Sequence, residues 1–202
     1  MGWRLPSGGT LFGAWILILV CLIAYTTYQA PPRTGTARGH NNLGVAYQKA
    51  GRIAEAKEQY SIALRKKPDY AHAYINMGTI LELEGEYGEA EIMYRMALRL
   101  EPDSAEAHYN LGNCLVRTNR WDEAAGEFGK VINKGVMLAE AHNNIGYIRA
   151  NQGRSIEAIS EFRKALRVNP DFDEALKNIV IFMGATGRGG QRHQNMAFRR
   201  DR

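Results

Sequence analysis

The residues that decide the fold are 71–104, AHAYINMGTILELEGEYGEAEIMYRMALRLEPDS, because the pattern that they contain returns at a fixed interval along the chain. A glycine, an alanine, an aromatic residue and a proline each recur every 34 residues, with no insertion. The recurring residues are Gly44, Gly78, Gly112 and Gly146; Ala56, Ala90, Ala124 and Ala158; Tyr60, Tyr94, Phe128 and Phe162; and Pro68, Pro102 and Pro170, with Val136 in the third proline position. Self-similarity at a fixed period of this length is typical of a stacked-repeat architecture.

Each unit is expected to form two helices joined by a turn. Glycine and alanine at fixed positions let two helices approach closely, and we expect large residues such as Tyr60 and Phe128 to fill the space between one pair and the next. The turn within each unit falls on residues that tolerate the left-handed backbone region. These are Gly51-Arg52, Gly85-Glu86, Asn119-Arg120 and Gly153-Arg154. Because one pair cannot bury its apolar face alone, stacking of neighbouring pairs supplies the core.

The pattern resembles the tetratricopeptide repeat family, whose 34-residue unit is a helix–turn–helix with the pattern W-x2-L-G-x2-Y, then A-x3-F, then P. The resemblance covers residues 37–70, 71–104, 105–138 and 139–172. Departures are His40, Tyr74, His108 and His142 in place of Trp, and Arg149 where Tyr is expected. The resemblance implies an all-α fold, a right-handed α-solenoid of four helix–turn–helix units. Residues 173–183 predict one further helix that caps the stack, and the basic tail, residues 184–202, is expected to be disordered.

An apolar segment precedes the repeats. Residues 11–28, LFGAWILILVCLIAYTTY, contain no charge over 18 residues. A helix of that length spans roughly 27 Å, close to the hydrocarbon thickness of a bilayer, so we expect one transmembrane anchor after a short tail, residues 1–10. A cleaved signal peptide is the alternative, although Tyr28-Gln29-Ala30 places a bulky ring where a small residue is needed. Residues 29–36 then form a linker, stiffened by Pro31-Pro32.

The excess of positive charge lies at the two ends of the chain. The formal net charge is +5, yet residues 38–183 carry 19 Lys and Arg against 20 Asp and Glu, a balance of −1. A domain that binds nucleic acid should be basic within its folded part, so no nucleic-acid partner is expected. Positive residues flank the apolar segment almost equally, with Arg4 before it and Arg33 and Arg38 after it. A short front tail that stays inside favours repeats on the translocated side over repeats in the cytosol.

A right-handed stack of helix pairs exposes its first helices on a concave surface, where we place the candidate binding groove. Each unit carries an asparagine two residues before its glycine, at Asn42, Asn76, Asn110 and Asn144. An amide offers one acceptor and two donors, so a row of amides could hydrogen-bond the backbone of an extended peptide. The row resembles the asparagine ladder of sugar-transferring enzymes that contain these repeats, but asparagine is also common here in the family consensus. Thr79 and Asn113 belong to the same candidate groove.

The second position of each unit bears on another binding mode that the resemblance implies. The clamp that holds the acidic C-terminus of heat-shock chaperones needs basic residues on the first helices. This chain carries Arg38, His72, Glu106 and Glu140 at that position, and we include all four in the candidate groove. The two glutamates would repel a carboxylate, so the clamp is not expected. The change of charge along the stack indicates a mixed or basic ligand segment.

Catalysis is not expected. His40, His108 and His142 share one repeat position, and neighbouring helices pack about 8–10 Å apart, too far to share a metal ion at bonds of about 2 Å. We therefore expect packing roles for these histidines. No phosphate-binding loop, nucleophile elbow, zinc-protease motif or paired-cysteine site is present in the sequence. No enzyme activity, metal or cofactor is predicted.

These features predict a membrane-tethered protein–protein interaction scaffold that binds a peptide or a partner subunit in the concave groove. The membrane contact is assigned to residues 11–28. One alternative is a regulatory or substrate-recruiting subunit of an enzyme complex, glycosyltransferase-like or secretion-related. Another is a self-assembling array, because no capping helix precedes the first unit and its open face is exposed.

Overall fold

The structure, a computed structural model, describes residues 35–186, and within this range it contains helices and no strand. The predicted anchor at residues 11–28 lies outside the described residues, as does most of the predicted basic tail. The helices of this range are α2 (Ala37–Lys49), α3 (Ile53–Lys66), α4 (Ala71–Glu84), α5 (Tyr87–Leu100), α6 (Ala105–Arg117), α7 (Trp121–Asn133), α8 (Leu138–Asn151), α9 (Ser155–Val168) and α10 (Asp173–Thr186).

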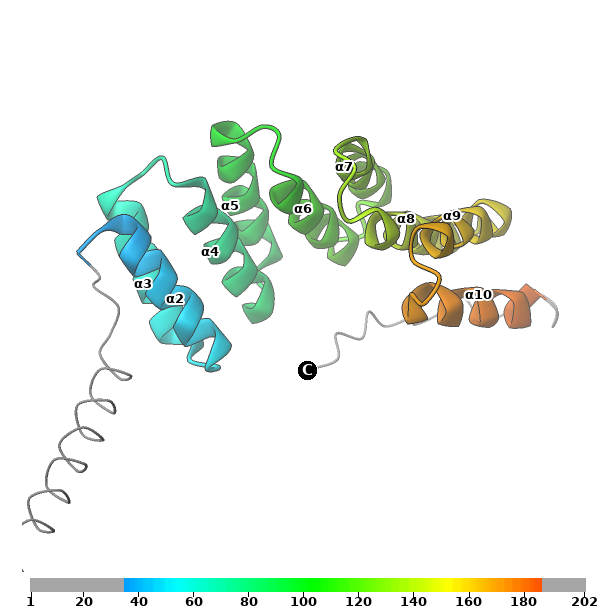
Figure 1. Cartoon of the computed structure of the whole chain (residues 1–202), viewed down its shortest axis with the longest axis horizontal. Coiled ribbons are helices and arrows are strands. Elements are labelled where there is room, and N and C mark those ends of the chain that lie inside the picture. Colours follow the sequence, from blue (N-terminus) through cyan, green and yellow to red (C-terminus); the bar gives the residue numbers. More distant parts are fainter. Residues whose placement is uncertain (1–34, 187–202) are drawn as a thin grey trace, which may run out of the picture.

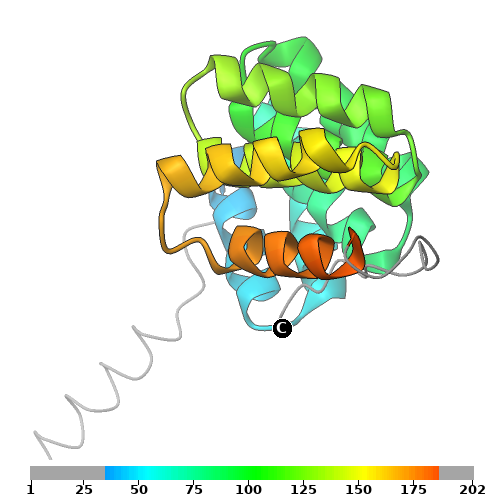
Figure 2. The ribbon, with the colours of Figure 1, turned by 90° about the vertical axis from the view of Figure 1, so that its right-hand side faces the viewer.

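Consecutive helices form pairs: α2 with α3, α4 with α5, α6 with α7 and α8 with α9. Each pair falls within one 34-residue unit. Figure 1 shows the pairs following an arc in chain order. First helices of neighbouring units contact each other, α4 with α6 and α8 with α10, which places the first helices on the inner side of the arc. The last helix, α10, packs alongside α9 (Figure 2). The described chain is therefore the all-helical solenoid that the repeat pattern predicts.

The recurring glycines lie where the first helix of each pair meets an aromatic ring of the second. A Cβ atom added to any of the four would lie 2.5–2.8 Å from a ring carbon. The glycine–ring pairs are Gly44–Tyr60, Gly78–Tyr94, Gly112–Phe128 and Gly146–Phe162. Each ring is at most 1% exposed. The expectation that these rings fill the space between pairs is therefore corrected: they fill the interior of their own pair, because the absent side chain of glycine leaves room for them there.

The predicted turns within the units are confirmed. Each holds one residue with positive φ: Gly51 at 73°, Gly85 at 84°, Asn119 at 60° and Gly153 at 75°. Asparagine is among the few other residues that adopt this region readily. The junction after α7 differs from the other junctions between units, because Gly135 (72°) and Met137 (48°) both adopt positive φ there. That junction is the one in which Val136 replaces the recurring proline.

The final helix ends at Thr186 rather than at Met183, where the sequence pattern placed the end of the capping helix. It packs mainly on α9 and to a smaller extent on α8. Over residues 35–186, no helix is long and apolar enough to cross a membrane.

Candidate protein-binding surfaces

The histidines that share one repeat position each bond the second helix of their own pair. The contacts from Nδ1 are His40 to Gln59 Oε1 (2.9 Å), His108 to Glu127 Oε2 (2.6 Å) and His142 to Glu161 Oε2 (2.8 Å). In the second unit the same two positions hold Tyr74 and Met93, so an apolar pair replaces the polar one. The histidines therefore join helices, as predicted. Within the described range, no group of three or more His, Cys, Asp or Glu residues could hold a metal ion.

Amide side chains connect the first helices of neighbouring units. The contacts are Asn76 Nδ2 to Asn41 Oδ1 (2.9 Å), Asn144 Nδ2 to Asn113 Oδ1 (3.1 Å) and Asn178 Nδ2 to Asn143 Oδ1 (2.9 Å). Asn144 also donates to the Tyr109 hydroxyl at 3.4 Å and is only 3% exposed. A buried amide needs such partners, because leaving it unpaired costs about 1–3 kcal/mol. Two of the four asparagines in the predicted row, Asn76 and Asn144, therefore hold the stack together.

The predicted groove residues all lie on first helices, and they differ in exposure. Exposed are Arg38, Asn42, His72 and Glu106; half-buried are Asn76, Thr79, Asn110, Asn113 and Glu140; buried is Asn144. The Thr79 hydroxyl donates to the Ile75 carbonyl at 3.1 Å. All ten belong to α2, α4, α6 or α8, the inner helices of the arc in Figure 1. The ten residues are thus spread over the first helices of all four units.

An ion-pair cluster joins the second and third units. The Arg120 guanidinium lies 2.6 Å from Glu91 and 2.6 Å from Glu123, and Arg95 contacts Glu91 at 2.8 Å and Glu123 at 3.9 Å. Burial alone would raise the pKa of Glu91, but the hydrogen bonds from Arg120 and Arg95 outweigh it and hold that pKa below its ordinary value. Exposed pairs contribute about 1 kcal/mol at most, so this cluster serves mainly to fix how one second helix lies against the next.

The polar groups of the core are paired among themselves. The Tyr94 hydroxyl donates to Glu82 Oε2 at 3.0 Å, and burial raises the pKa of Tyr94 far above its ordinary value. The Cys114 thiol donates to the Tyr87 carbonyl at 3.1 Å, and burial raises its pKa to about 11. Throughout residues 35–186, every buried side-chain nitrogen or oxygen has a hydrogen-bond partner. The polar groups of the core therefore stabilise the packing of the helices, and the candidate binding sites lie on the surface.

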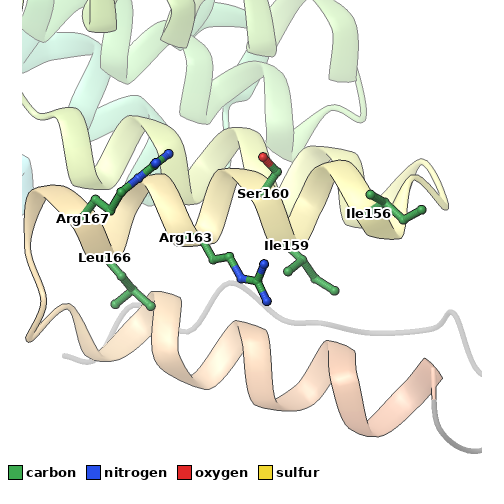
Figure 3. A pocket seen from close by; sticks show the side chains of 6 residues that line it. All are labelled: Ile156, Ile159, Ser160, Arg163, Leu166 and Arg167. Atoms are coloured by element: carbon green, nitrogen blue, oxygen red, sulfur yellow. The ribbon is translucent and has the colours of Figure 1, made fainter.

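A surface hollow lies on an outer helix, where the sequence analysis placed no site. It has a volume of about 750 Å³ and is lined by Ile156, Ile159, Ser160, Arg163, Leu166 and Arg167, all on α9. Figure 3 shows Ile159, Arg163 and Leu166 directed from α9 towards α10. The sequence did contain a signal, because Ile156 and Ile159 stand where α7 carries Asp122 and Ala125. Comparing the units position by position would have shown this apolar change in the last second helix.

Comparison with solved structures shows the same fold in other proteins. PilW, a widely conserved type IV pilus biogenesis factor, is 25% identical; the match covers 75% of this chain and 70% of that chain, with a TM-score of 0.70. MamA is 22% identical, with 71% of this chain and 84% of that chain covered and a TM-score of 0.65. A chain of the APC/C hetero-tetramer Cut9–Hcn1 is 17% identical, with 73% and 30% covered and a TM-score of 0.68. The search of curated proteins gave no match.

Three family models, each described as a tetratricopeptide repeat, match residues 41–102, 81–142 and 139–172. Together these ranges run from α2 to the junction after α9 and contain every glycine–ring pair. The 34-residue period, the helix pairs and the three matches agree. The chain belongs to the tetratricopeptide repeat family.

Proposed function

We propose that this protein is a membrane-tethered interaction scaffold whose first helices bind an extended segment of a partner protein. The observation that carries the proposal is the exposure of polar and charged side chains on the inner helices. Arg38, Asn42, His72 and Glu106 are exposed on α2, α4 and α6, and none of them belongs to the core. Repeat arrays use such extended surfaces for binding, because stacking places equivalent side chains of successive units in a row.

The charge at the second position of the units changes sign along the stack. Arg38 and His72 stand on the first two units, and Glu106 and Glu140 stand on the last two. Complementary charge fixes the orientation of a partner and excludes wrong partners more than it adds affinity. We therefore propose a partner segment whose acidic end lies towards α2 and whose basic end lies towards α8.

Two asparagines of the predicted row remain suited to a ligand. Asn42 is exposed, and Asn110 is half-buried. Asn76 and Asn178 each donate to the asparagine 35 residues earlier, Asn41 or Asn143. The residue 35 positions before Asn110 is Ile75, whose apolar side chain cannot accept a hydrogen bond. Asn113 accepts a hydrogen bond from the amide of Asn144, but among residues 35–186 no side chain accepts one from the amide of Asn110. Asn42 and Asn110 are thus the amides that we assign to the partner backbone.

The test of the binding face is affinity purification of the full chain from a membrane extract. Wild type is compared with the Asn42→Ala, Asn110→Ala double variant and with a control, Glu58→Ala, Arg65→Ala, whose residues are exposed on α3. We expect proteins that copurify with wild type and with the control to be lost from the inner-face variant. The same set of proteins on all three chains would show that the inner face is not the binding site.

The tether is assigned to residues 11–28 on their sequence alone. Carbonate extraction should leave the full chain in the membrane fraction and should release a chain that lacks these residues. A C-terminal tag should be protected from a protease confined to the cytoplasmic side if the repeats are translocated. Release of the full chain by carbonate would contradict the tether, and cleavage of the tag would place the repeats in the cytosol.

A second candidate function is a subunit of a secretion-related assembly. It is favoured by the likeness to PilW, a type IV pilus biogenesis factor, at 25% identity and a TM-score of 0.70. Under this proposal the full chain, solubilised in mild detergent, should migrate in size-exclusion chromatography with a multi-subunit complex. Migration at the mass of the single chain, or of a homo-oligomer of it, would argue against this candidate.

A further inference from the structure

The repeat pattern continues into α10, whose residues stand at the positions that a first helix would occupy in a fifth unit. Ala175 is fully buried at the position of Ala141, one unit on, and Asn178 donates to Asn143 just as Asn76 donates to Asn41. In the four complete units, the glycine position receives an aromatic ring from the second helix. In α10 that position is Val180, which is 70% exposed. Within the described residues, α10 is thus a first helix to which no second helix is paired.

The exposed side of α10 is apolar at both positions that face a second helix in the complete units. Leu176 stands one unit after His142, which bonds the second helix of its pair through Glu161. Leu176 is 44% exposed and Val180 is 70% exposed. Since a terminal capping helix commonly presents a polar outer face, these two side chains indicate a surface that is covered by something else.

The neighbouring side of α9 is also uncovered. In the interior units, this side of a second helix contacts the next unit: Asp122 accepts from Gln152 at 2.9 Å, and Glu91 from Arg120 at 2.6 Å. At these two positions α9 carries Ile156 and Ile159, and Ile156 is 87% exposed. Single exposed apolar residues are ordinary, but several around one hollow mark an interaction site. Here they line the hollow of about 750 Å³ on α9, and Figure 3 shows Ile159 on the side of α9 that faces α10.

Two arginines give the hollow a positive charge. Over the described part of the chain, neither Arg163 nor Arg167 forms an ion pair. Arg163 stands two units after Arg95, which contacts Glu123 in the first turn of the next second helix. The interior of the stack therefore shows which group complements this position: a carboxylate near the start of a helix lying against α9.

The chain's own C-terminal residues do not have the composition of that helix. Residues 187–202 contain five arginines and one aspartate, so their charge has the same sign as that of Arg163 and Arg167. One unit after the recurring Ala158, Phe162 and Ala165 stand Arg192, Met196 and Arg199. The small–aromatic–small pattern by which a second helix packs is missing there.

We propose that α9 and α10 form a docking surface for an amphipathic, acidic helix of a partner protein, which lies where the second helix of a fifth unit would lie. Its apolar side covers Ile156, Ile159 and Leu176, and a carboxylate pairs with Arg163 as Glu123 pairs with Arg95. Because Val180 stands in the glycine position, the partner presents small residues, rather than an aromatic ring, towards α10. This surface is separate from the inner face, so it does not depend on the function proposed above.

The test places a photo-crosslinking amino acid at residue 156 of the full chain in cells that produce the protein. Ile156 is 87% exposed, so the exchange does not disturb packing. We expect an adduct with another protein, whose linked peptide, mapped by mass spectrometry, is acidic and amphipathic. Arg163→Glu and Arg167→Glu should each lower the adduct yield roughly tenfold or more, because like charges placed against each other oppose binding.

The matched control is Arg65→Glu, since Arg65 occupies in α3 the position that Arg167 occupies in α9, and both lie in the last turn of an exposed helix end. Both changes place a carboxylate in the last turn of a helix, and the control should keep the wild-type adduct yield. An adduct with a second copy of the chain, a link to residues 187–202, no adduct, or equal yields from Arg167→Glu and wild type would each overturn the proposal.

Discussion

Replacing Gly78 with alanine tests the packing that defines every pair in this solenoid. The new Cβ would lie 2.6 Å from Tyr94 Cε1, 2.9 Å from Cδ1 and 3.0 Å from Cζ. Carbon atoms pack best at about 3.5–4.0 Å, so the ring must move by roughly 1 Å. Tyr94 is fully buried, and its hydroxyl donates to Glu82 at 3.0 Å. The ring therefore moves only if α5 shifts or if that hydrogen bond breaks.

The magnitude follows from three contributions. Overpacking costs about 1–3 kcal/mol, and an unpaired buried group costs about 1–3 kcal/mol. Alanine gains about 1 kcal/mol over glycine in helix propensity. The expected net loss in the free energy of unfolding is about 1–5 kcal/mol, which lowers Tm by about 2–20 °C for a domain of this size.

Thermal and urea unfolding followed by circular dichroism measure this loss. Gly126→Ala is the matched control, because Gly126 is exposed within α7 and a Cβ there meets nothing within 4 Å. That change should raise the free energy of unfolding by about 0.5–1 kcal/mol. In the third unit, Phe128→Leu should relieve part of the damage of Gly112→Ala, since two residues in contact are coupled. A Gly78→Ala chain that melts at or above the wild-type temperature would show that the Tyr94 ring accommodates the added methyl group without loss of packing.

Three further predictions follow from the buried polar groups. Asn144→Ala should lower the free energy of unfolding by about 1–3 kcal/mol, because it removes a buried amide with two partners, whereas the exposed Asn42→Ala should change it by less than about 0.5 kcal/mol; urea unfolding compares them. In a Cys21→Ser chain, iodoacetamide at pH 8 should modify Cys114 far more slowly in the folded than in the urea-unfolded state, since its pKa is about 11 and it is fully buried; equal rates would contradict the buried, protonated thiol. Burial alone would raise the pKa of Glu161, but hydrogen bonds from Lys164 and His142 hold it below its ordinary 4.5. The ionised Glu161 therefore adds stability that is complete above pH 4.5 and is lost as the pH falls through the lower folded pKa. Glu161→Gln should shrink the fall in urea midpoint between pH 7 and strongly acid solution, whereas Glu58→Gln, an exposed control, should leave that fall unchanged.

The repeat architecture could be predicted from the sequence because its determinants are local and recur at a fixed spacing. Gly51 and its equivalents end first helices in every unit, and the left-handed turns follow from residue type alone. The place of the aromatic rings could not be predicted from periodicity, because a period of 34 leaves open whether Tyr60 faces its own pair or the next. The glycine contact decides it, since Gly44 and Tyr60 belong to the same unit.

The hydrogen-bond partners of the asparagines depend on how the first helix of one unit is offset against the first helix of the next. The contacts join residues 35 apart, Asn41 with Asn76 and Asn143 with Asn178, and not residues in the same repeat position. A search for a row of identical residues finds Asn144 but gives no sign that its amide is already used. The surface of α9 and α10 was not predicted from the repeat pattern for a different reason. Its apolar character appears only when the residues of one unit are compared with those of the others.

The proposed function requires that the inner helices of the arc bind a partner protein. The most direct measurement is a photo-crosslinking profile of the full chain in its membrane, with the reactive amino acid placed in turn at Asn42, Thr79 and Asn113 on first helices and at Glu58, Ile92 and Gly126 on second helices. We expect adducts with one partner from the first-helix positions and none with that partner from the second-helix positions. Adducts from the second-helix positions alone, or equally from both sets, would contradict it.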